Sequence, residues 1–380
     1  MEASARLAGW RRRDGVAYAA LLMLGALDAA GYSVIAPVLP TIAWRTGAGP
    51  ALIGLLVASF PAAMVVGFAL AGRGVRSRRT TPMLRLSLAL ILIGCAGLVL
   101  GDSLAVYAAA RVVMGLGSGG LWIGITFATL ERWPGQEYVC MSRVFAAYSA
   151  GGLIGPALGA LGGVRLPFAV YGVLVALGFA VVYALGASPE PRTFASDRAA
   201  LRLRGFWLAS AGILFAVLGL GVVEGVLPLH LSERLTQGEI GGLYVGMSLV
   251  VSASAAVAGA LRPRPILLGS TLLVVSGLAL AGATTAIPIW LLALALAGCG
   301  IGLANTGSLG VLVETVKAER IVTAMVIWSQ IGIFGYLLGP VVGGAATQAL
   351  GYGALGLVPA AAAVVLIAAY MSAGRAPASA

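Results

Sequence analysis

The chain has 380 residues, of which 60% are hydrophobic and only 10% charged, and its mean hydropathy is +1.01. Soluble domains carry about 25% charged residues, so this composition excludes a soluble protein. The formal net charge is +11, from 24 Lys and Arg against 13 Asp and Glu. A basic balance can indicate a nucleic-acid surface, but the distribution described below assigns it to membrane topology instead, and no nucleic-acid partner is expected.

Apolar runs bounded by charges or by Pro and Gly predict twelve membrane-spanning helices, because about 20 residues cross the hydrocarbon core. The expected fold class is therefore an all-α integral membrane protein. The predicted spans cover residues 17–39, 51–72, 83–101, 104–128, 141–163, 166–186, 205–228, 240–260, 265–286, 288–309, 321–347 and 351–373.

The basic residues fix the orientation of these spans. Twenty of the 24 fall on the side of the membrane that holds the N-terminus, while Arg45, Arg165 and Arg234 fall on the other side and Arg111 lies within a span. Cytoplasmic loops carry the excess of Lys and Arg, so both termini are expected in the cytoplasm and the protein in the cell (inner or plasma) membrane. The twenty are Arg6, Arg11, Arg12, Arg13, Arg73, Arg76, Arg78, Arg79, Arg85, Arg132, Arg143, Arg192, Arg198, Arg202, Arg204, Arg262, Arg264, Lys317, Arg320 and Arg375.

The chain reads as two similar halves. The longest break in hydrophobicity predicts a cytoplasmic linker at 187–204 between six-helix bundles at 1–186 and 205–380. An offset of 188 places Val38-Leu39-Pro40 on Val226-Leu227-Pro228, and offsets of 183 to 184 place Gly115, Gly117 and Gly119 on Gly298, Gly300 and Gly302. Two pseudo-symmetric bundles of like orientation are the architecture of carriers in which one half rocks against the other.

Spans five and eleven carry matching glycine and proline motifs. Small residues four apart let neighbouring backbones approach, and Pro removes a backbone hydrogen bond so that the helix can bend. The motifs resemble the Gly-Pro motif of drug/proton antiporters of the major facilitator superfamily, and the resemblance to that superfamily runs over the whole chain. It implies a gating or leak-sealing bend, with plain close packing as the alternative. The residues are Gly151, Gly155, Pro156 and Gly159 in span five and Gly339, Pro340 and Gly343 in span eleven.

Ionisable residues inside the predicted spans are the main candidates for function. Asp28 lies about twelve residues into span one, close to the middle of the bilayer, where a carboxylate must be protonated, paired or facing water. Tyr32 follows one turn later on the same face. Arg111 begins a stretch that resembles the superfamily motif whose buried Arg is linked to proton transfer, with snorkelling to the outer surface as the alternative. Glu224 precedes Val226-Leu227-Pro228 in span seven.

The arrangement of Asp28 before Pro37-Val38-Leu39-Pro40 is similar to that in vesicular monoamine transporters, whose first-helix Asp faces the amine. Three departures count against a monoamine substrate and an ordinary gate. The loop between spans two and three has Arg78 and Arg79 but lacks the acid that normally precedes them. Asn305 and Ser329 occupy the positions where the monoamine carriers hold acids in spans ten and eleven.

Weaker candidates surround a possible central cavity. Trp122, Tyr148, Trp328, Gln330 and Tyr336 are candidates for its lining, with interhelical packing as the alternative for each. Tyr244, Ser248 and Ser252 form a stripe on span eight. His230, the single histidine, lies just beyond span seven and is expected at the surface.

The predicted function is a proton-coupled antiporter that exports a small drug-like, amphipathic or cationic compound. A proton-coupled uptake symporter for a sugar, nucleoside or metabolite is one alternative, and a non-transporting membrane sensor is another. The sequence has no GxxxxGK loop, HExxH or nucleophile elbow, so no enzyme activity is expected. The proton gradient is expected to drive transport, without a cofactor or a metal. The expected partners are the small-molecule substrate, protons and lipid, and the protein is expected to be a monomer.

Overall fold

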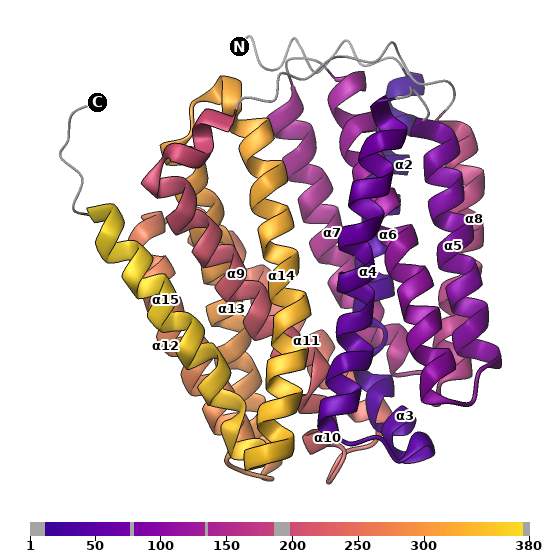
Figure 1. The fold of residues 1–380 in the computed structure, drawn as a ribbon, viewed down its shortest axis with the longest axis vertical. Coiled ribbons are helices and arrows are strands. Elements are labelled where there is room, and N and C mark those ends of the chain that lie inside the picture. Colours follow the sequence, from indigo (N-terminus) through magenta and orange to yellow (C-terminus); the bar gives the residue numbers. More distant parts are fainter. Residues whose placement is uncertain (1–11, 77–79, 134–135, 186–197, 375–380) are drawn as a thin grey trace.

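The computed structural model describes residues 12–76, 80–133, 136–185 and 198–374, and the regular elements within them are all helices. Twelve long helices lie side by side (Figure 1). They are α2 (Arg12–Ser33), α4 (Pro50–Arg76), α5 (Thr80–Leu100), α6 (Leu104–Arg132), α7 (Glu137–Gly159), α8 (Arg165–Ala184), α9 (Arg204–Gly225), α11 (Gln237–Ala258), α12 (Pro263–Gly282), α13 (Ile287–Thr315), α14 (Ala318–Leu350) and α15 (Leu357–Gly374).

Five short elements complete the described part of the chain: η1 (Ala36–Val38), α3 (Leu39–Thr46), η2 (Arg198–Arg202), α10 (Leu227–Leu231) and η3 (Tyr352–Gly356). α3 and α10 lie at the end of the molecule opposite to that at which α2 begins (Figure 1). We call these the α3–α10 end and the terminal end.

Eleven segments of the described chain are long and apolar enough to cross a membrane. The remaining long helix is α7, in which Arg143, Tyr148 and Ser149 interrupt an otherwise apolar run. The expected class, an all-helical multi-pass membrane protein, is confirmed.

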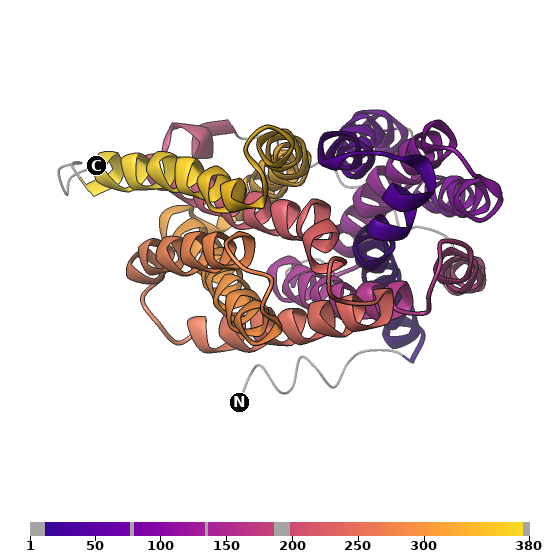
Figure 2. The same cartoon turned by 90° about the horizontal axis from the view of Figure 1, so that it is seen from below.

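Buried apolar side chains form two clusters, one drawn almost entirely from α2–α8 and the other almost entirely from α9–α15. Two bundles stand side by side in both views (Figures 1 and 2). We call them the N-half and the C-half. Most of the expected linker, 187–204, lies outside the described residues.

The glycines that repeat between the halves make equivalent close contacts. In α6, a Cβ at Gly119 would collide with the Met64 carbonyl of α4, and one at Gly117 would lie 2.6 Å from the Ser87 carbonyl of α5. In α13, Gly302 meets α11 and Gly300 meets α12 in the same way. Each half is therefore built around one glycine-rich helix that packs closely on two neighbours.

The predicted first span differs most from the structure. The sequence predicts one helix over 17–39, whereas α2 ends at Ser33 and a new short helix, α3, begins at Leu39. α9 likewise ends at Gly225, and α10 begins at Leu227. Both short helices start with Leu-Pro, because Pro is favoured in the first turn of a helix and cannot continue a preceding one. The repeat thus extends to two matching helix breaks.

Candidate functional site

Arg111 of α6 lies completely buried, at 0% exposure, so its guanidinium does not snorkel to the surface. Its Nη1 donates a hydrogen bond of 3.1 Å to the Gly31 carbonyl of α2. Its central carbon lies 4.4 Å from the ring centroid of Phe60 and 5.8 Å from that of Tyr32, so the cation rests against aromatic faces. Among the described residues, its Nε and Nη2 have no hydrogen-bond partner.

The end of α2 creates the acceptor that Arg111 uses. Gly31 lies in the last turn of α2, where carbonyls lack a partner within the helix. A Cβ at Gly31 would collide with the hydroxyl of Tyr171, which donates a 3.0 Å hydrogen bond to the Leu27 carbonyl. Glycine at this position therefore lets α6 and α8 both reach the backbone of α2.

Asp28 lies three residues before Gly31, in the interior of the N-half, and is 2% exposed. Within the part of the chain that the structure describes, neither carboxylate oxygen has a hydrogen-bond partner. The side chain of Ser118 on α6 lies close enough to interact with it, and Tyr148 and Tyr171 interact with it electrostatically. An unpartnered carboxylate in this setting is costly when charged, which makes it a candidate for binding a proton or a cation.

Glu224 occupies the last turn of α9 in the C-half and is 6% exposed. Its Oε2 has no hydrogen-bond partner among the described side chains and backbone. It interacts electrostatically with Arg111 and Tyr32 of the N-half without forming a direct ion pair in the described structure. The ring of Tyr32 also lies 4.2 Å from that of Tyr336, on α14. Tyr32, Arg111 and Glu224 are therefore brought together where the two halves meet, and Asp28 is linked to Glu224 indirectly, through Tyr148, which interacts electrostatically with both acids.

A cavity of about 120 Å³ opens between the halves on the terminal side of this cluster. Asn305, the candidate from span ten, lines it, whereas Asp28 and Glu224 do not. A smaller neighbouring cavity of about 30 Å³ holds Gln330 and shares Trp122, Phe145 and Ser329 with the first. The lining of the larger cavity comprises Met64, Trp122, Phe145, Tyr148, Ser149, Ile213, Val217, Asn305, Trp328, Ser329, Gly332, Ile333 and Tyr336.

The sequence did not reveal how Trp328 is held at the cavity wall. Its indole Nε1 donates to the Ser308 hydroxyl at 2.8 Å, and Ser308 donates to the Ala209 carbonyl at 2.6 Å. This chain joins α14, α13 and α9 and fixes the indole. A serine in an apolar glycine-rich helix gives no sequence signal that points to a distant tryptophan.

The glycines of the span-five motif pack α7 against α2. A Cβ at Gly151 would collide with the Ala26 carbonyl, one at Gly155 would lie 2.8 Å from the Ala30 carbonyl, and one at Gly159 would lie 2.6 Å from the Val34 carbonyl. These glycines allow the close packing named as the alternative.

In α14, Gly339 and Gly343 pack on α9 in the corresponding way. A Cβ at Gly339 would lie 2.5 Å from the Leu218 carbonyl, and one at Gly343 would lie 3.3 Å from Val222. The gating role of these glycines remains a prediction.

α7 and α14 also carry contacts between the halves at the α3–α10 end. A Cβ at Gly54 of α4 would collide with the Pro340 carbonyl of α14. On the other side, a Cβ at Gly241 of α11 would lie 2.9 Å from the Pro156 carbonyl of α7. The halves therefore touch backbone to backbone at this end, and the cavity lies on the terminal side of the contacts.

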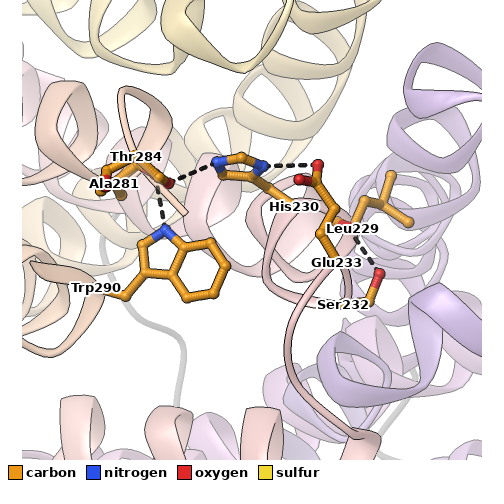
Figure 3. A network of polar contacts seen from close by, with 7 residues as sticks. All are labelled: Leu229, His230, Ser232, Glu233, Ala281, Thr284 and Trp290. Atoms are coloured by element: carbon orange, nitrogen blue, oxygen red, sulfur yellow. Dashed lines mark hydrogen bonds and ion pairs between the residues drawn. The ribbon is translucent and has the colours of Figure 1, made fainter. Parts of the chain in front are cut away.

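His230 of α10 is 5% exposed, so the expectation of a surface histidine is wrong. Its Nδ1 lies 2.9 Å from Oε1 of Glu233 and its Nε2 lies 3.0 Å from the Thr284 carbonyl oxygen (Figure 3). Its ring stacks on Tyr352 at 4.3 Å and meets the edge of Trp290 at 5.4 Å. The contact with Thr284 joins α10 to the connection between α12 and α13, and the ring contacts join it to α13 and η3. Arg78 and Arg79 lie outside the described residues.

Solved structures of other proteins share this fold. A solved bacterial homologue of the human lysosomal transporter Spinster, inward-facing and unoccupied, has a TM-score of 0.77 at 15% identity and covers 97% of this chain and 98% of that chain. The occupied inward-facing form has a TM-score of 0.78 at 15% identity, with the same coverage. A mutant of the nucleoside transporter NupG has a TM-score of 0.69 at 14% identity, covering 94% and 99%.

Such similarity shows the fold, and a sequence comparison shows the family. No curated protein sequence matches. A family model described as Major Facilitator Superfamily matches residues 21–261 and 209–380. Since these matches span most of the chain, the protein belongs to the major facilitator superfamily of membrane transporters.

Proposed function

We propose that the protein is a proton-coupled antiporter that exports a small, amphipathic, cationic organic compound by alternating access. The observation that carries this proposal is Asp28, whose two carboxylate oxygens are buried without a hydrogen-bond partner among the described residues. A buried carboxylate is stabilised either by a proton or by a cationic substrate. Competition between the two at one site couples export of the substrate to entry of the proton.

The cavity lining supports the substrate class. Trp122, Phe145, Tyr148, Trp328 and Tyr336 present aromatic surface to it, which favours an aromatic or aliphatic body and attracts a cationic group. Asn305 and Ser149 add a few polar contacts. Tyr148 interacts electrostatically with both Asp28 and Glu224, and so connects the lining to the two acids.

Binding requires a wider cavity than this conformation offers. Sites for drug-sized ligands have volumes of about 300–1,000 Å³, whereas the present cavity has about 120 Å³. The halves touch at the α3–α10 end, so the extra volume arises by separation at the terminal end. With both termini in the cytoplasm, this conformation is closed to the outside and ready to admit a compound from the cytoplasm.

Purified protein in liposomes with an imposed pH gradient tests the proposal. We expect wild type to move a fluorescent lipophilic cation against a proton flux, and Asp28→Asn to reduce this exchange to the level of protein-free liposomes, because an amide carries neither the proton nor the charge. Asp102→Asn is the matched control, since Asp102 is exposed and pairs with Arg165 at the α3–α10 end. Asp28→Asn exchange at the wild-type rate would overturn the proposal.

The same liposomes distinguish export from uptake. An antiporter moves protons and substrate in opposite directions, whereas a proton-coupled uptake symporter moves them together. Internal pH recorded while substrate is added outside therefore separates the two, and acidification of the lumen by added substrate would favour the symporter.

A further inference from the structure

Pro156 leaves a backbone carbonyl without its helical partner. In an α-helix the carbonyl of residue 152 accepts from the N–H of residue 156, and Pro has no N–H. The Gly152 carbonyl instead accepts a 3.2 Å hydrogen bond from the hydroxyl of Ser248, on α11 of the C-half. The proline of the span-five motif therefore provides an acceptor for the opposite half.

The end of α7 provides two more acceptors. The Gly159 and Gly163 carbonyls accept from Nε2 of Gln237 at 2.7 and 2.9 Å. Gly162 and Gly163 have φ values of +93° and +64°, so they form a left-handed turn that favours glycine. Both hydrogens of the Gln237 amide are thus used, and its Oε1 accepts from the Thr41 hydroxyl at 2.8 Å.

Gln237 and Ser248 act from one face of one helix. They are eleven residues apart, about three turns of α11, and both reach across to the N-half. The opposite seam, between α4 and α14, is held by close backbone approach at Gly54 and Gly344, and no side-chain hydrogen bond crosses it in the described residues. The two seams therefore differ in chemistry, and of the two, the α7–α11 seam is the one that side-chain hydrogen bonds between described residues hold.

We propose that Gln237 and Ser248 form a hydrogen-bonded latch that keeps the α3–α10 end closed and must release before the cavity opens there, with Pro156 supplying the acceptor for Ser248. The latch rests on the alternating-access cycle proposed above. Its groups are uncharged, so its strength is insensitive to salt.

Distances between the halves test the latch without a substrate. Spin labels at Arg45→Cys and Arg234→Cys, two exposed sites on opposite halves of the α3–α10 end, report its opening in lipid nanodiscs after Cys95, Cys140 and Cys299 are replaced by Ala. Net hydrogen-bond contributions predict that Gln237→Met raises the ratio of open to closed molecules by at least about tenfold, and Ser248→Ala by roughly fivefold.

Two controls match these substitutions. Ser252→Ala removes a hydroxyl that bonds only within α11, to the Ser248 carbonyl. Gln348→Met changes an exposed glutamine at the same end, beside Gly49. Both should retain the wild-type distance distribution.

A double-mutant cycle tests the role of Pro156. Pro156→Ala restores the N–H that pairs with the Gly152 carbonyl inside α7, so Ser248→Ala should then change the ratio by less than about twofold. Thr41→Val removes only one of the hydrogen bonds of Gln237 and should shift the ratio of open to closed molecules less, in the same direction. If Gln237→Met does not fold, Thr41→Val takes its place in the test.

The latch would be overturned if the spin-label distances in the Gln237 and Ser248 variants equalled those in the controls. Transport on the same preparations keeps the two proposals separate. A wild type that exchanges no substrate would refute the proposed function while the distance result stands, whereas unchanged distances with intact transport would refute the latch alone.

Discussion

A charged side chain in the membrane interior needs a partner, and Arg111 finds one in the backbone rather than in an acid. It binds the Gly31 carbonyl in the last turn of α2 and rests against Phe60. The position of the acceptor depends on the break after Ser33, because an unbroken α2 would use that carbonyl in its own hydrogen bonding. The placement of the cation is therefore a consequence of where the first helix ends.

Gly31→Ala tests this placement. Its Cβ would collide with the Tyr171 hydroxyl and disturb the contact of Tyr171 with Leu27, so we expect the variant to lose about 1–3 kcal/mol of stability, as overpacking does elsewhere. Thermal unfolding in detergent measures the loss. Adding Tyr171→Phe removes the colliding oxygen and should restore part of the stability, and a double variant no more stable than Gly31→Ala would contradict this explanation.

At the scale of elements, α7 uses its two sides differently. Gly151, Gly155 and Gly159 lie against α2 in their own half, while Gly152 and Pro156 face α11 of the other half. Close packing and a role at the seam are therefore properties of different faces of one helix. The two interpretations of the Gly-Pro motif are compatible.

Two alanine substitutions on α7 separate these faces. A Cβ at Gly155 would collide with Ser33 and press on the Ala30 carbonyl, so Gly155→Ala should lower the thermal midpoint. A Cβ at Gly152 would meet nothing within 4 Å, and alanine is the better helix former, so Gly152→Ala should be neutral or stabilising by up to about 1 kcal/mol. Equal midpoints for the two variants would contradict the packing described here.

Helices were more predictable than the contacts between them. Long apolar runs determine spans almost alone, which is why the sequence predicts twelve. The break after Ser33 was missed because residues 34–39 are as apolar as those before them, and only Pro37 and Pro40 mark it. Gln237 was missed because a lone polar residue near a span end is ordinary, and its partners are carbonyls 74 and 78 residues away.

At the scale of the whole molecule, the halves meet at the α3–α10 end and the cavity lies toward the terminal end. Asp28, Arg111 and Glu224 could be singled out from the sequence because charge is rare inside the spans. The interaction of Arg111 with Glu224 across the interface could not, because a contact between the halves leaves no mark on the pattern of spans. The repeat does not relate the two acids either, since its offset of 188 places Ala216 opposite Asp28.

This asymmetry predicts one-sided access to the cavity. Asn305 is exposed and lines it, so Asn305→Cys, in protein freed of its native cysteines, should react with a membrane-impermeant maleimide added from the side of the terminal end, which is the expected cytoplasmic side. The same reagent added from outside should label it at least about tenfold more slowly, because the touching backbones exclude it. Inverted and right-side-out vesicles measure both rates, and equal rates would contradict a closed α3–α10 end.

The acceptors of the α7–α11 seam have an evolutionary consequence. They are main-chain oxygens of Gly152, Gly159 and Gly163, and a substitution cannot delete a main-chain oxygen as it deletes a side chain. Thr41 and Pro156 apart, inherited change can adjust the strength of this seam chiefly through positions 237 and 248. Natural variants that differ in turnover should therefore carry their differences on α11 rather than at the positions whose main-chain oxygens accept these bonds.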